Sequence, residues 1–208
     1  SKAVLVQSNT FIATGHAIQS AGGIVVPFDL NNSYTASKED IYDAYLDCQK
    51  NNIEVAAVCV VNIAGRASKD LSEIVNFCRA KKIPLVEDNA QGFLSSFDDK
   101  KLGTFADFSA YSFQTTKVVA CGEGGAISCS NKEDLNNIRQ FINFGRDMES
   151  PLFYKSISGN FKLSEISAAF ILMDLERCND RIKRRSEIDE FYKQNFVNKE
   201  YLYYLNPP

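Results

Sequence analysis

The chain has 208 residues, of which 45% are hydrophobic and 12% aromatic, a composition typical of a globular protein with room for one well-buried domain. Its net charge is −3 and it carries no basic stripe, which argues against nucleic acid as the main partner. It has no signal peptide and no apolar run near the length of about 20 residues that a membrane span needs, so no membrane association is expected.

Strands and helices alternate along the chain. Most of the expected strands are continuous apolar runs, as is typical of strands that are covered on both faces. This alternation predicts an α/β fold, a three-layer sandwich with a mostly parallel sheet, in which ligands bind outside the carboxyl ends of the strands. The expected strands are 4–6, 24–28, 55–61, 85–87, 108–113 and 126–129.

Helical patterns lie between these strands. The first, 14–21, is followed by two glycines that form a C-terminal stop. Ser37 is expected to cap the second helix, because Asp40 follows three residues later. Two later helices are indicated by apolar residues spaced on one face, which are Leu71, Ile74, Val75 and Cys78, and then Leu135, Ile138 and Ile142.

The last part of the chain is expected to hold one long helix, from Ser164 to about Asn195. Such length is more than a small domain needs, so the helix is interpreted as a connector. The predicted division is a large domain over 1–163, ending in an excursion loop over 145–163, and then the long helix and the start of a truncated small domain over 164–208. Because the chain lacks a starting methionine, we expect it to be a piece of a larger protein.

The six cysteines are scattered without metal-ligand spacing, and the chain has one histidine. A zinc site is therefore not expected, and no metal is predicted. Reduced, mostly buried thiols in a cytoplasmic protein are the interpretation of this pattern.

Lys117 and Asp88 carry the most chemical information. Lys117 ends a hydroxyl-rich turn after the strand 108–113, and Asp88 follows the strand 85–87. An amine and an acid at two strand ends suit an aldehyde cofactor with a pyridine ring, since the amine forms a Schiff base and the acid keeps the ring nitrogen protonated. The alternatives are an ordinary surface lysine and an acid that caps a helix or turn.

Three motifs follow in order: Glu87-Asp-Asn-Ala-Gln91, Ser112-Phe-Gln-Thr-Thr-Lys117 and Gly122-Glu-Gly-Gly-Ala126. Together with the stretches 8–14 and 159–169, they resemble the DegT/StrS family of sugar aminotransferases. These are pyridoxal 5'-phosphate (PLP) enzymes of the aspartate-aminotransferase fold, also called fold type I. The resemblance covers nearly the whole chain and implies that 1–163 is the PLP-binding large domain.

The resemblance implies a role for each of five residues. Lys117 would form the Schiff base and shuttle the proton, and Asp88 would pair with the pyridine nitrogen. Gln91 would lie against the ring or its 3'-oxygen, Ser112 would bind the phosphate, and Phe11 would stack on the ring. The alternatives left open are helix-start polarity for Gln91, a sheet-end hydroxyl for Ser112 and a plain core position for Phe11.

Two further cofactor-binding residues follow from the resemblance. Asn160 and Lys162 match a segment that reaches across a dimer interface in the family, toward the neighbour's phosphate and substrate, although a solvated loop is the alternative. Glu123 is expected to be structural or close to the substrate. The Arg184-Arg185 pair is expected to be a solvated helix face.

By resemblance, the function is PLP-dependent transfer of an amino group, with glutamate as the donor, to a nucleotide-linked keto-sugar. Such products belong to cell-surface or secondary-metabolite sugar biosynthesis, and a homodimer is expected. The family's phosphate-binding turn would precede Ser1, so the 208-residue piece alone is expected to bind PLP weakly and to be inactive. The alternatives are a non-catalytic or regulatory homologue that keeps the fold for dimerisation, and a Rossmann-like nucleotide binder at 122–125, whose glycines lead into a strand instead of a helix.

Overall fold

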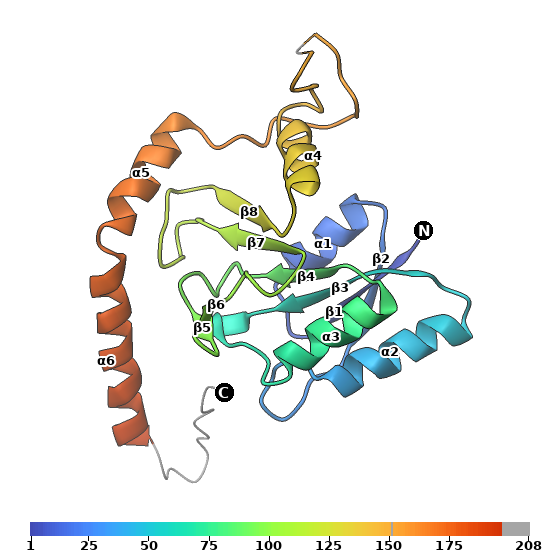
Figure 1. Ribbon diagram of the computed structural model, residues 1–208. Coiled ribbons are helices and arrows are strands. Elements are labelled where there is room, and N and C mark those ends of the chain that lie inside the picture. Colours follow the sequence, from blue (N-terminus) through green and yellow to red (C-terminus); the bar gives the residue numbers. More distant parts are fainter. Residues whose placement is uncertain (151, 197–208) are drawn as a thin grey trace.

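A six-stranded sheet with helices on both faces forms the centre of the molecule (Figure 1). This computed structural model describes residues 1–150 and 152–196. The first five strands of the order β2-β1-β3-β4-β7-β8 are parallel, and β8 runs antiparallel to β7, so the predicted mostly parallel sheet is confirmed. The strands are β1 (Ala3–Gln7), β2 (Ile24–Phe28), β3 (Val55–Val61), β4 (Leu85–Asp88), β7 (Phe108–Ser112) and β8 (Gly125–Cys129).

The strand order places the first three helices on two faces. The connection from β1 to β2 moves one way along the sheet, and the connections to β3 and β4 move the other way. Since parallel crossovers are right-handed, α1 covers one face while α2 and α3 cover the other, which gives the expected three layers (Figure 1). These helices are α1 (Ile12–Ser20), α2 (Lys38–Lys50) and α3 (Leu71–Lys81).

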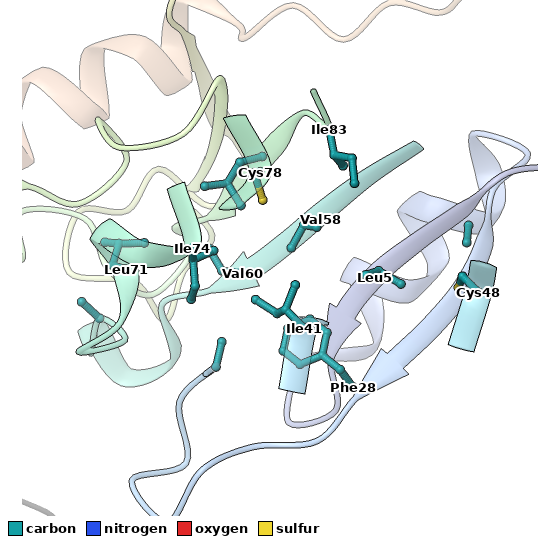
Figure 2. Close-up of a cluster of buried hydrophobic side chains, with 14 of the residues drawn as sticks. Leu5, Phe28, Ile41, Cys48, Val58, Val60, Leu71, Ile74, Cys78 and Ile83 are labelled. Carbon is teal, nitrogen blue, oxygen red and sulfur yellow. The ribbon is translucent and has the colours of Figure 1, made fainter. Parts of the chain in front are cut away.

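The larger part of the hydrophobic core lies between the sheet and the α2/α3 layer. Figure 2 shows Ile41 of α2 and Ile74 of α3 directed toward Leu5 and Val58 on the central strands. All four side chains are fully buried. Ser37 caps α2 as predicted, because its Oγ accepts a hydrogen bond from the backbone N–H of Asp40.

The opposite face of the sheet is covered by α1 through a smaller cluster that includes Val6, Ile18 and Cys59. Helix α1 begins at Ile12, two residues before the predicted start, because the backbone N–H of Thr14 already donates to the carbonyl of Phe11. Beside α1, small side chains leave a largely apolar groove of about 720 Å³ over this face.

The prediction of one long helix after Ser164 is wrong. The structure has two helices, α5 (Glu165–Leu175) and α6 (Cys178–Phe196), which meet at a break over Glu176 and Arg177. Asp174 and Arg181 pair side chain to side chain across this break. Seven residues of continuous helix would separate their backbones by about 10.5 Å along the axis, so the change of direction lets the two side chains meet.

The rest of the chain connects these helices to the sheet. Helix α4 (Lys132–Ile142) follows β8, and the described part of 145–163 contains no helix or named strand, as expected for an excursion loop. Three short elements were not predicted: the 3-10 turn η1 (Ile63–Gly65), β5 (Ser96–Phe97) and β6 (Lys100–Lys101). The division into domains stays a prediction, because 197–208, the expected start of a second domain, lies outside the described residues.

Two absences apply to the described part of the chain. None of its helices combines the length and the apolar character that crossing a membrane requires. Its histidine, cysteine and acidic side chains form no group that could hold a metal ion.

Candidate active site

A cavity of about 650 Å³ lies at the carboxyl ends of four strands. Its walls come from the segments that follow β1, β3, β4 and β7 and from the turn before β8. This is where ligands bind in sheets of this type. Five predicted cofactor-binding residues line this one cavity, although they are spread over more than half of the chain: Phe11, Asp88, Gln91, Ser112 and Lys117.

Lys117 lies in the loop that joins β7 to β8. The base of the loop is closed by two backbone hydrogen bonds, from Phe113 N–H to Gly124 and from Cys121 N–H to Phe113, both at 2.8 Å. Gly122 has a φ of +90°, a left-handed conformation that suits glycine. The loop therefore has a defined shape, and the half-buried Lys117 amine has no hydrogen bond or ion pair within the described residues.

Asp88 is held at the end of β4 by two donors. Its Oδ2 accepts from the Thr14 hydroxyl at 2.7 Å, and its Oδ1 accepts from the backbone N–H of Ala90 at 3.1 Å. Thr14 lies in the first turn of α1 and also contacts the Thr10 hydroxyl at 2.7 Å. The Asp88 carboxylate is thus oriented by one donor from α1 and one from the turn after β4.

Glu87 points to the opposite face, as the alternation of side chains along a strand predicts. It is fully buried and accepts four hydrogen bonds, one from the Asn62 amide and three from backbone N–H groups of Gly103, Phe105 and Ala106. Asn62 is itself 2% exposed and also donates to Asn89. The Glu87–Asn62 network therefore belongs to the scaffold and lies apart from the cavity.

The other three cavity residues differ in how firmly they are held. Gln91 Oε1 accepts from the backbone N–H of Ala64 at 2.8 Å, which leaves its amide nitrogen directed away from that bond. Ser112 Oγ accepts a long bond of 3.3 Å from the N–H of Gln114. Phe11 precedes α1 and is 70% exposed, so the alternative of a plain core position for this ring is wrong.

Asn160 and Lys162 do not line the Lys117 cavity. They line a neighbouring hollow of about 380 Å³, and Glu123 lies in the walls of both spaces. Lys162 donates to Asn143 Oδ1 at 2.7 Å and lies over the Phe144 ring. Within one chain these two residues are therefore beside the cavity but outside it.

The two arginines expected to form a solvated helix face have different surroundings. Arg184 pairs with Glu187 in solvent. Arg185 is also exposed, as expected, and it lines a hollow of about 400 Å³ together with Gln91 and Lys117. Arg185 lies one turn after Arg181, which binds the Lys117 loop, so both occupy the face of α6 directed at the loop.

Two groups of residues at the site were not predicted. Thr14 orients Asp88, but a threonine in a first helical turn gives no sequence signal for such a contact. Asp174 and Arg181 bind the loop just after Lys117, and both lie in a stretch that reads as one amphipathic and then charged helix. The Arg181 guanidinium and the Ala120 N–H hold the pKa of the Asp174 carboxyl below its usual value.

Comparison with known proteins assigns the chain to a family. The sequence profile that describes the DegT/DnrJ/EryC1/StrS aminotransferase family matches residues 1–207. The chain belongs to this family. The resemblance seen in its motifs is thereby confirmed.

Two curated relatives and one solved structure illustrate the likeness. The chain is 29% identical over 204 residues to UDP-4-amino-4,6-dideoxy-N-acetyl-beta-L-altrosamine transaminase of Campylobacter jejuni, with 96% of this chain and 53% of the relative covered. It is 30% identical over 193 residues to GDP-perosamine synthase of Escherichia coli O157:H7, with 92% and 51% covered. A putative PLP-dependent aminotransferase from Bacillus cereus superimposes with a TM-score of 0.82 at 31% identity, over 93% of this chain and 51% of that one. The chain thus spans about half the length of the curated relatives it matches.

Proposed function

We propose that the chain is the cofactor-binding part of a PLP-dependent aminotransferase that acts on a nucleotide-linked keto-sugar. The observation that carries the proposal is the single cavity shared by the Lys117 amine and the Asp88 carboxylate. When bound, PLP supplies an aldehyde that condenses with amines and a pyridine ring that accepts electrons.

The residues around the cavity fit this cofactor. Its volume of about 650 Å³ is in the usual range for cofactor sites. Lys117 would hold the aldehyde, Asp88 the ring nitrogen and Ser112 the phosphate. The exposed Phe11 ring offers a flat apolar surface for a heteroaromatic ring, and Gln91 has an amide nitrogen for a ring substituent.

The chain's own groups have distinct tasks in this proposal. Lys117 Nζ forms no ion pair with an acid within the described residues. In this proposal it accepts and returns the proton that moves on the substrate. The Asp88 carboxylate would face the ring nitrogen, because Thr14 and Ala90 each hold one of its oxygens. Asn160 and Lys162 would contribute to the phosphate and substrate site of a second subunit, since they lie beside their own cavity and not in it.

The substrate class rests on the family. The two curated relatives are named for a UDP-linked and a GDP-linked amino sugar. We propose a nucleotide-linked keto-sugar as the amino acceptor, glutamate as the donor and a homodimer as the assembly, with a place in cell-surface or secondary-metabolite sugar biosynthesis.

The test is the reaction of PLP with the complete protein of which this chain is proposed to be a part. Wild type is expected to gain a visible absorbance band that borohydride converts into a stable adduct, and mass spectrometry should find that adduct on Lys117. Lys117→Ala should lose both the band and amino transfer. Lys100→Ala, which removes an exposed lysine outside the cavity, is the matched control and should behave as wild type.

The non-catalytic alternative predicts a different result. A homologue that keeps the fold only for dimerisation would form no adduct at Lys117, and Lys117→Ala would change nothing. Amino transfer retained in Lys117→Ala would overturn the proposed function.

A further inference from the structure

The segment just after Lys117 is bound to the α5–α6 break by an ion pair. Arg181 and Asp174 form a two-bonded pair, Nη1 to Oδ2 and Nη2 to Oδ1, both at 2.6 Å. Such a fork geometry restricts the relative orientation of both groups more than a single contact does. The pair is oriented further because each member also binds the backbone of the loop.

The two backbone bonds lie on either side of one residue. Asp174 Oδ2 accepts from the N–H of Ala120 at 2.9 Å, and Arg181 Nη1 donates to the carbonyl of Val118 at 2.8 Å. The Val119 side chain between them is 1% exposed and packs with Phe113 and other apolar residues of the loop and of α5. Three consecutive residues are thus fixed from two directions.

We propose that the Asp174–Arg181 pair positions Lys117 for its reaction with the cofactor aldehyde. The pair touches neither the cofactor space nor the amine, so it is a positioning pair and acts through the backbone of 118–120. Lys117 directly precedes this fixed segment in the chain. Its amine must reach the aldehyde carbon of the cofactor to react, so the position of the segment determines the position of the amine. The inference rests on the proposed function, because it assumes that Lys117 is the reacting residue.

The polarity of the arrangement gives a specific test. The loop offers an N–H donor at Ala120 and a carbonyl acceptor at Val118, so the pair must place its acid at the first and its base at the second. Exchanging the two members keeps an ion pair across the break, but it brings a guanidinium to the N–H and a carboxylate to the carbonyl. The exchange thereby distinguishes a pair that positions Lys117 from a pair that only holds α5 and α6 together.

The experiment measures adduct formation and loop protection in the complete protein. In the adduct reaction the Lys117 amine adds to the aldehyde carbon of PLP and one water leaves, and the rate is followed by absorbance and borohydride trapping. Hydrogen exchange of the peptide that covers 114–122 is measured without PLP. Thermal midpoints are recorded for every variant.

Asp174→Asn and Arg181→Lys are expected to slow adduct formation by about ten- to a hundredfold, because small displacements of a reacting group cost rate of this order. They should also speed exchange at Ala120. The exchanged pair, Asp174→Arg with Arg181→Asp, should recover the thermal midpoint while the adduct rate stays low. Glu187→Gln removes the acid of the exposed Arg184–Glu187 pair on the same helix and should leave rate and exchange unchanged.

Three outcomes would overturn the inference, and the last of them differs from the first two. If wild type forms the adduct and the Asp174 and Arg181 variants form it equally fast, or if the exchanged pair recovers the full rate, the pair only joins helices. If wild type forms no adduct at Lys117, the proposed function fails and the inference falls with it.

Discussion

At the scale of single residues, the site depends on how Asp88 is held. One of its oxygens is bound by a hydroxyl from α1 and the other by its own turn, so its direction is set by two elements that meet only in the folded chain. Because the proposed function requires this carboxylate to point at the cofactor ring, the groups that orient it should matter for rate more than for binding.

Thr14→Val tests this dependence. The change keeps the shape of a buried side chain and removes the hydroxyl that donates to Asp88. A lost hydrogen bond to a charged group costs about 1.5 kcal/mol, which is roughly tenfold in rate. We expect kcat to fall by about that factor, with the PLP adduct at Lys117 still formed, in a steady-state assay of the complete protein.

Thr104→Val is the control, since the exposed Thr104 hydroxyl binds the backbone carbonyl of Lys101 and not Asp88. Equal kcat for wild type and Thr14→Val would show that Asp88 is oriented without Thr14.

Arg185 supports a second prediction at this scale. Its side chain lines the hollow that also contains Lys117, and no ion pair holds it within the described residues. A guanidinium there suits an anionic group of the substrate. Arg185→Ala should raise the KM for the anionic substrate by about ten- to a hundredfold, the worth of one charge-assisted hydrogen bond, and leave the PLP adduct unchanged.

The neighbouring Arg184→Ala serves as the matched control, because Arg184 pairs with Glu187 in solvent. An unchanged KM in Arg185→Ala would assign Arg185 to the solvated face that the sequence suggested.

At the scale of elements, most strands and helices could be predicted because their signals are local. Continuous apolar runs mark β2 and β3 to the residue, and the Ser37–Asp40 spacing marks the start of α2. The break between α5 and α6 could not be predicted, because the Asp174 and Arg181 side chains that pair across it bind a loop over fifty residues earlier, and such a contact leaves no local signal in the sequence.

The same reasoning separates the predicted and missed parts of the site. Asp88 and Ser112 end β4 and β7, and Lys117 lies in the loop after β7. Parallel strands bring their ends together, so the meeting of these residues follows from the fold. Arg181 and Arg185 lie among several charged residues on α6, and only their distance from the loop distinguishes them. The place of Asn160 and Lys162 in a separate hollow also depends on tertiary packing.

The cap of α2 is the element whose contribution is easiest to measure. Ser37→Ala removes the oxygen that accepts from the Asp40 N–H, and loss of such a cap costs about 1 kcal/mol. We expect the free energy of unfolding from urea titration to fall by about that amount. Ser20→Ala, at the exposed end of α1, should change it by much less; equal losses would show that the cap adds nothing specific.

At the scale of the whole molecule, burial sorts the cysteines into two groups. Cys48, Cys59 and Cys78 are buried, and the other three are partly exposed, so the expectation of mostly buried thiols holds for half of them. Burial, with a smaller effect of the nearby Asp88 carboxylate, raises the pKa of Cys59 to about 12. Burial, with a smaller effect of Asp107, raises the pKa of Cys78 to about 12.

Thiol alkylation should therefore report on global folding. The thiolate is the reactive form, so Cys59 and Cys78 should stay unlabelled by iodoacetamide at pH 8 while Cys121, Cys129 and Cys178 react. Labelling of the first two should appear only across the urea unfolding transition, as read by peptide mass spectrometry. Labelling of Cys59 in native buffer at the rate of an unfolded peptide would contradict the packing of α1 on the sheet.

The two adjacent acids of β4 have a consequence for strand alignment. Glu87 finds its four donors in only one register, and a shift by one residue would carry Asp88 into the scaffold side and Glu87 into the cavity. The strand has only four residues, and few ladder bonds resist such a slip. Glu87 therefore helps to fix the register: a misaligned β4 would move its carboxylate away from three backbone N–H groups and an amide, so the register that satisfies these donors with Glu87 is also the one that places Asp88 at the cavity.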